Sequence, residues 1–201
     1  MDYAEVYLKK NRREAISEKS PWIFSGAIEA VREFDEDGGL CRILLEDEVV
    51  ATGYVNTQTN IAVRILDFGK VEVNTAFIRR RFHESRRMKE TLLQGGTDAY
   101  RLIHAEGDRF PGLVVDRYGD YLVLQSSTAG IDNLRPLIVE ALIEEFQPRG
   151  ILEKSSSTSR KTEGLESAQQ VLHGEIPDEI IVQEHGLKYA VDLHGGQKTG
   201  F

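Results

Sequence analysis

Cationic side chains concentrate in one short segment of an otherwise acidic chain, and guanidinium groups there could hold the phosphates of RNA. The 201-residue chain has a formal net charge of -8, yet residues 73–95 carry 6 Lys and Arg against 2 Asp and Glu. Arginine binds phosphate oxygens through two parallel N–H donors, and local field rather than net charge decides docking. The sequence therefore predicts an RNA contact formed by Arg79, Arg80, Arg81, Arg86, Arg87 and Lys89.

A second basic group lies near the N-terminus, beside the only tryptophan of the chain. Cations next to an aromatic ring can contact phosphate while the ring stacks on an unpaired base. A competing interpretation, which we favour for the aromatic side chains, places Trp22 and Phe24 in a hydrophobic core. The residues of this second predicted RNA contact are Lys9, Lys10, Arg12, Arg13, Trp22, Ser25 and Gly26.

No combination of side chains predicts catalysis or metal binding. Asp116 and Asp108 each precede an arginine, but both pairs sit beside tight turns, where aspartate often caps the backbone. The glycine-rich residues 195–200 lack the spacing of a phosphate-binding loop. Cys41 is the single cysteine, so no cysteine–histidine cluster suggests zinc. We therefore expect neither a catalytic residue nor a metal in this chain.

The composition, with 40% hydrophobic and 29% charged residues, is ordinary for a globular protein, and 201 residues can hold two small units. The chain has no run of about 18 apolar residues and no apolar stretch behind its charged N-terminus. We therefore expect a cytoplasmic protein without a membrane partner.

The first third of the chain has the pattern of short strands separated by turns, which is typical of a small barrel. Polar turn residues at 35–39 and 56–60 divide it, and residues 12–19 are expected to form a short helical segment. The predicted strands are residues 4–9, 27–34, 41–46, 49–54 and 61–66.

An uninterrupted helix is predicted over residues 75–93, with Asn74 or Thr75 as its cap. It would separate the barrel from the rest of the chain and bury an apolar stripe beneath its cationic surface. The stripe consists of Phe77, Ile78, Phe82, Met88, Leu92 and Leu93.

The remaining residues alternate between strand and helix, which predicts an α+β layer. Asp132 is expected to cap a helix that ends at residue 146, and the polar residues 155–161 to form a surface loop. Residues 180–184 and 187–191 have the pattern of a β-hairpin. The other predicted strands are residues 100–105, 113–116, 121–126 and 150–154.

Several motifs resemble one known family when they are taken in order along the chain. Residues 10–12 and 20–26 resemble the opening of a PUA domain, a small RNA-binding barrel. Residues 101–108 and 110–120 resemble the middle domain of the large-subunit ribosomal RNA cytosine-5 methyltransferase family, and residues 160–165 and 192–201 also match that family. The likeness spans nearly the whole chain.

The resemblance implies an α+β fold in three parts: a PUA-like β-barrel at 1–72, a basic helix with a strand-helix-strand middle domain at 73–175, and a β-hairpin at 176–201. The hairpin would lead into a Rossmann-like methyltransferase domain that the chain stops short of. For the parent enzyme the resemblance implies S-adenosyl-L-methionine as cofactor and ribosomal RNA as partner, with methyl transfer to carbon 5 of a cytosine in 23S rRNA. We expect this chain alone to be inactive and to bind no cofactor. The residues that the resemblance places near the cofactor are Gln197, Lys198, Thr199, Gly200 and Phe201.

Two further hypotheses compete with RNA recognition. In one, the chain is a non-catalytic interaction module whose basic helix contacts acidic surfaces of a protein partner or of a second copy. In the other, the hairpin leaves a strand edge unpaired, and that edge forms a homodimer.

Overall fold

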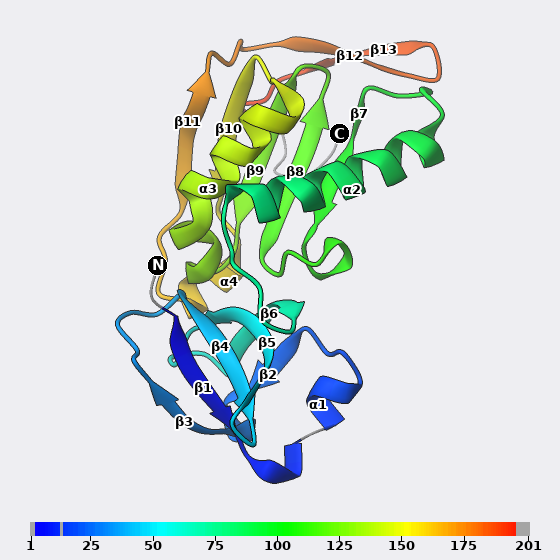
Figure 1. Ribbon diagram of the computed structural model, residues 1–201. Coiled ribbons are helices and arrows are strands. Elements are labelled where there is room, and N and C mark those ends of the chain that lie inside the picture. Colours follow the sequence, from blue (N-terminus) through cyan, green and yellow to red (C-terminus); the bar gives the residue numbers. More distant parts are fainter. Residues whose placement is uncertain (1–2, 13, 196–201) are drawn as a thin grey trace.

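The computed structural model describes residues 3–12 and 14–195, without the side chains of residues 12–15. A curled sheet forms one end of the molecule, a second sheet with two helices on one face forms the middle, and a hairpin lies at the far end (Figure 1). The predicted mixed α+β class is confirmed.

The curled sheet has six strands in the order β2-β6-β5-β4-β1-β3. Only β1 and β4 pair in parallel, and alternate residues such as Val6, Ile43 and Val63 fill the barrel interior. The five predicted strands are present, and β2 is an additional one. The strands are β1 (Ala4–Leu8), β2 (Trp22–Phe24), β3 (Ile28–Arg32), β4 (Gly39–Leu45), β5 (Glu48–Val55) and β6 (Ile61–Phe68). A short helix, α1 (Glu14–Ser17), lies within the predicted helical segment.

The basic helix α2 (Thr75–Leu93) has the predicted bounds, and the Asn74 side chain accepts a hydrogen bond from the backbone N–H of Phe77 at 2.9 Å. Its first half buries the predicted apolar stripe. The prediction is wrong for Met88 and Leu92, which are 46% and 70% exposed, because the last turns of α2 extend past the layer beneath them.

The second sheet has five strands in the order β11-β10-β9-β8-β7, and α2 and α3 lie side by side on one of its faces (Figure 1). Therefore α2 packs within this layer and does not simply separate it from the barrel. Helix α3 (Ala129–Phe146) joins the parallel strands β9 and β10, and it begins three residues before Asp132. Thr128 and not Asp132 is its N-cap. The strands are β7 (Ala99–His104), β8 (Leu113–Tyr118), β9 (Tyr121–Ser126), β10 (Gly150–Ser155) and β11 (Ala168–Gly174).

The polar residues 155–161 lie mostly at the surface, as the sequence predicts, but they do not form a loop. They end β10 and form α4 (Thr158–Thr162), and the side chain of Arg160 points into the molecule with only 3% of the residue exposed. Strand β11, which follows α4, was not predicted. Internal partners therefore order this segment despite its polar composition.

The predicted hairpin is confirmed as β12 (Ile180–Glu184) and β13 (Leu187–Val191). Val182 is fully buried and joins Tyr118 and Leu152 in a small apolar cluster between the hairpin and the second sheet. Among the described residues, no helix is long and apolar enough to cross a membrane.

The barrel has its own buried interior, and it also shares a second hydrophobic cluster with the middle layer. Leu40, Tyr54 and Leu66 of the barrel belong to the same buried cluster as Phe82 of α2 and Ile131 of α3. The division at residue 72 therefore stays a prediction, because the barrel has an interior of its own and also packs against the middle layer.

Candidate nucleic-acid interface

Strand β2 presents two aromatic side chains to solvent at the edge of the barrel sheet. Successive residues of a strand point to opposite faces, and Ile23 fills the barrel interior with 1% exposure. Trp22 and Phe24 consequently face outward and are 38% and 49% exposed. The favoured prediction that these two rings fill the core is therefore wrong.

Part of the predicted N-terminal contact is brought together beside these aromatic residues. The Lys9 ammonium group donates to the carbonyl of Gly26 at 2.8 Å, so the end of β1 meets the turn that follows β2. The backbone N–H of Ser25 donates to the carbonyl of Asn60. Lys10 is exposed nearby in sequence. The side chain of Arg12 and the whole of Arg13 lie outside the described residues.

Most of the cationic surface of α2 is already neutralised by carboxylates of the same chain. Arg79 pairs with Glu144 at 2.8 Å and Arg86 with Glu90 at 2.8 Å, and Lys89 lies 3.6 Å from Asp108. RNA phosphates would therefore compete with these carboxylates for three of the six predicted cations. Surface pairs of this kind hold their cations only weakly, because water and salt screen them.

Arg81 is not on the surface of α2. It is 5% exposed, pairs with Asp67 of β6 at 2.7 Å and donates to the carbonyl of Arg109. Burial lowers the pKa of Arg81, and the neighbouring Asp67 opposes that effect. The predicted phosphate contact of Arg81 is therefore replaced by a structural contact with the barrel.

Two arginines of α2, Arg80 and Arg87, are exposed and have no carboxylate partner within the described part of the chain. Arg80 lies over the ring of Phe77 with its guanidinium carbon 5.7 Å from the ring centre. These two side chains are the cations of α2 that are free to meet phosphate without first breaking an ion pair.

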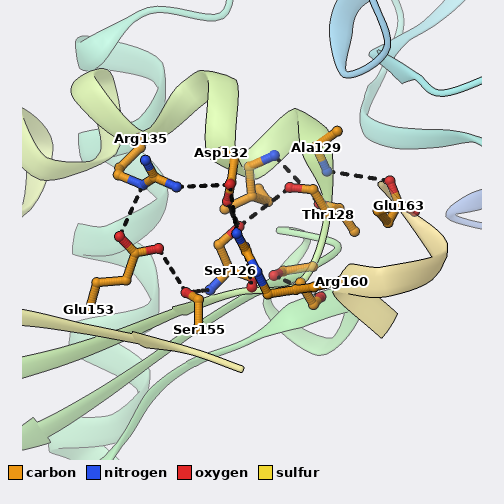
Figure 2. A network of polar contacts seen from close by, with 12 residues as sticks. Ser126, Thr128, Ala129, Asp132, Arg135, Glu153, Ser155, Arg160 and Glu163 are labelled. Atoms are coloured by element: carbon orange, nitrogen blue, oxygen red, sulfur yellow. Dashed lines mark hydrogen bonds and ion pairs between the residues drawn. The ribbon is translucent and has the colours of Figure 1, made fainter. Parts of the chain in front are cut away.

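A buried polar network joins α4 to β9 and to the start of α3 within the middle layer (Figure 2). Arg160 of α4 makes two hydrogen bonds of 2.9 Å with the carboxylate of Asp132, and it also donates to the carbonyls of Ser126 and Glu166. Ser126 donates to Asp132 as well. Burial raises the pKa of Asp132, but these hydrogen bonds and the charges of Arg135 and Arg160 hold it below its usual range.

Glu163 continues this network into the barrel. Its carboxylate accepts from the side-chain amide of Asn56 at 2.8 Å and lies 2.8 Å from the guanidinium of Arg64. The same carboxylate accepts from the backbone N–H of Ala129 at the start of α3. Because Glu163 is 6% exposed and contacts both layers, it holds them in one fixed arrangement.

Tyr54 packs at the same boundary between barrel and middle layer. We call the contacts of Arg160, Glu163 and Tyr54 at this boundary the joint. The fully buried ring lies against Gly130 of α3, and its hydroxyl donates to the carbonyl of Pro111 at 2.8 Å and lies 3.0 Å from the Thr128 hydroxyl. Burial raises the pKa of the Tyr54 hydroxyl. Network and ring together make a rigid connection between barrel and middle layer.

The described residues do not fit a nucleotide cofactor at the place where this fold could offer one. In α/β sheets such ligands bind at the carboxyl ends of parallel strands, beside a helix N-terminus. Here that place lies between β9 and α3, where the Glu163 carboxylate meets the Ala129 N–H and the ring of Tyr54 covers Gly130. The predicted cofactor-proximal residues 197–201 lie outside the described part of the chain.

The two aspartates considered for catalysis have structural partners. Asp116 binds Arg101 through both carboxylate oxygens, at 2.8 and 3.1 Å. Asp108 accepts from Ser85 and from the backbone N–H of His104. Among the described residues no cluster of three or more His, Cys, Asp or Glu side chains could hold a metal ion.

Sequence reasoning missed Glu106 and the joint residues Arg160 and Glu163. Glu106 accepts a hydrogen bond of 2.9 Å from the indole N–H of Trp22, 84 residues away in sequence. No local pattern marks such long-range polar partners. The resemblance of residues 160–165 to a family motif was the one signal available for the joint.

Comparison with known proteins identifies a PUA-like domain and a set of relatives. Residues 6–68 match the family model of PUA-like domains. The chain is 36% identical over 201 residues to ribosomal RNA large subunit methyltransferase I of Vibrio vulnificus and 38% identical over 200 residues to that of Aliivibrio fischeri. Each match covers 98% of this chain, but only 51% and 50% of the relatives.

Solved structures show the same fold at lower sequence identity. A protein described as "a putative sam-dependent methyltransferase from Streptococcus mutans" superposes with a TM-score of 0.76 at 21% identity, and it covers 96% of this chain. A second structure, described as "a putative methyltransferase complexed with SAH", gives the same TM-score at 22% identity. The chain spans 49% of each. It is therefore similar, along almost its whole length, to about half of a ribosomal RNA large subunit methyltransferase I.

Proposed function

We propose that this chain is the RNA-recognition part of an S-adenosylmethionine-dependent methyltransferase that acts on carbon 5 of a cytosine in 23S ribosomal RNA. The observation that carries the proposal is the similarity of 98% of the chain to ribosomal RNA large subunit methyltransferase I. In this proposal the barrel and α2 hold ribosomal RNA. Methyl transfer belongs to the part of the relatives that this chain does not cover.

The rigid joint supports a positioning role. A barrel that binds RNA can present one nucleotide to a distant reactive centre only if the connection between them does not bend. The Glu163 network and the Tyr54 ring supply that rigidity within the described residues. Docking and chemistry are then divided between two regions of one enzyme.

Replacing Arg80 and Arg87 together with glutamine is expected to weaken binding to a transcribed fragment of 23S rRNA and to flatten its salt dependence. Each lost phosphate contact reduces the slope of log affinity against log salt by about one unit, so the double variant should lose up to about two. Fluorescence anisotropy over a range of salt concentrations measures this slope.

Lys188 is a matched control, because it is exposed on the hairpin and not on α2. Its replacement with glutamine should leave the slope unchanged. If the α2 double variant binds RNA as the unchanged protein does, Arg80 and Arg87 do not contact RNA, and the interaction-module hypothesis gains support. The homodimer through the hairpin stays a prediction.

Isothermal calorimetry is expected to detect no micromolar binding of S-adenosylmethionine to this chain. The reason is that side chains of the joint occupy the described position at which the fold could accept a nucleotide. Titration of the RNA fragment into the same protein shows that the sample is folded and able to bind RNA. Micromolar binding of the cofactor would show that residues of this chain are sufficient for a cofactor site.

A further inference from the structure

The outward face of β2 has the properties of a stacking surface. Trp22 and Phe24 are two residues apart on one strand, so their side chains leave the sheet on the same side about 7 Å apart. This spacing is about twice the 3.4 Å separation of stacked bases. One base could therefore insert between the two side chains and contact both. Aromatic rings are sequence-tolerant partners for bases, because every base has a π-face.

The Trp22 ring is held in place before any ligand arrives. Its indole N–H donates to Glu106 at 2.9 Å. The Ser20 hydroxyl accepts from the backbone N–H of Trp22 and donates to its carbonyl, which fixes the backbone beneath the ring. Its cross-strand partner is Arg64, which Glu163 fixes in the joint. A side chain that is already ordered loses little conformational entropy when a ligand stacks on it.

A cation and an open glycine suited to a sugar-phosphate backbone lie at the turn that follows β2. Lys9 donates to the carbonyl of Gly26 there, whereas Lys10 lines a pocket with Tyr7 and Glu29 of β1 and β3. Gly26 is exposed, and no atom lies within 4 Å of where a Cβ would be, so a ligand backbone can approach the chain closely. Glu106 is the opposing charge at this place, and its hydrogen bond to the indole accounts for its presence.

We propose that Trp22 and Phe24 stack on unpaired nucleotides of the RNA, while Lys9 contacts an adjoining phosphate. This inference rests on the proposed function and adds the kind of RNA that the barrel takes. Bases of a duplex are already stacked on one another, so exposed protein rings favour single-stranded tails, bulges or loops. Lys9, at the turn after β2, favours a polyanion over an apolar protein surface.

The single tryptophan of the chain makes the proposal directly measurable. Two RNAs are used, a blunt hairpin and the same hairpin with a single-stranded tail. The unchanged protein is expected to bind the tailed RNA more tightly, with quenching of Trp22 fluorescence. Trp22→Ala and Phe24→Ala should each weaken binding of the tailed RNA at least about fivefold and leave the blunt hairpin unaffected. Trp22→Phe should retain most of the affinity, because a ring remains.

Ile181→Ala is the matched control, since Ile181 is a 59% exposed apolar residue on the hairpin, away from β2. Circular dichroism and thermal unfolding of each variant separate loss of stacking from loss of fold. Equal binding of both RNAs by the unchanged protein, or full affinity in Trp22→Ala, would overturn the stacking inference and leave the proposed function standing. Failure of the unchanged protein to bind either RNA would overturn the proposed function itself.

Discussion

Replacing Gly130 with alanine is expected to lower the free energy of unfolding by about 2–3 kcal/mol. A Cβ at this position would lie 2.2 Å from ring carbons of Tyr54, which is fully buried and hydrogen-bonded through its hydroxyl. Helix propensity alone favours alanine over glycine by about 1 kcal/mol, so the two effects have opposite signs. The clash should win, because the fixed ring cannot move away. Urea unfolding followed by circular dichroism measures the difference.

Gly107→Ala is the control for this substitution. No atom lies within 4 Å of a Cβ at Gly107, so its effect should stay within about 0.5 kcal/mol. Because Tyr54 belongs to the cluster that joins the barrel to the middle layer, Gly130→Ala should lower the midpoint of one unfolding transition common to both layers. A variant as stable as the unchanged protein would mean that the Tyr54 ring can shift and that the joint is looser than its contacts indicate.

Local patterns predicted the elements whose signals lie within themselves. Helix α2 has its predicted bounds because Asn74 caps it and neither glycine nor proline interrupts it. The hairpin β12–β13 follows from two short strands around His185 and Gly186, both of which have a positive φ. These features depend on neighbours in sequence, which are visible before any tertiary contact is known.

Features that depend on distant partners could not be predicted in the same way. Arg160 lies in a polar run without periodicity, and its partner Asp132 is 28 residues away. Strand β2 has only three residues, too few to show that Ile23 points inward and the aromatic residues outward.

Arg81 is an intermediate case, because the helical repeat alone places it on the buried side of α2. It lies four residues after Phe77 and three after Ile78, both of which are buried. The six cations of α2 therefore do not form one surface, because this helical spacing places Arg81 on the buried side. The helical spacing buries Arg81, which joins α2 to the barrel, and leaves its neighbour Arg80 exposed, where it can contact RNA.

Arg160→Ala is expected to cost about 3 kcal/mol of stability at neutral pH, because it leaves a largely buried Asp132 with fewer partners. The guanidinium is 4% exposed and makes four hydrogen bonds, two of them to Asp132. Arg135, at 2.9 Å from Asp132, offsets part of the loss. Urea unfolding measures the cost, and Lys161→Ala is the control because Lys161 is the exposed neighbour of Arg160.

The cost of Arg160→Ala should depend on pH with a definite sign. Burial raises the pKa of Asp132, but hydrogen bonds from Arg160 and Ser126 outweigh it and hold the folded pKa below the ordinary value of about 3.9. The stabilisation from this carboxylate is therefore fully present above pH about 4 and is lost as the pH falls through the lowered pKa. The stability difference between the unchanged protein and Arg160→Ala should narrow in acid. A difference that stays constant from neutral pH to pH about 3 would mean that Arg160 stabilises the joint through its backbone carbonyl partners and not through the charge of Asp132.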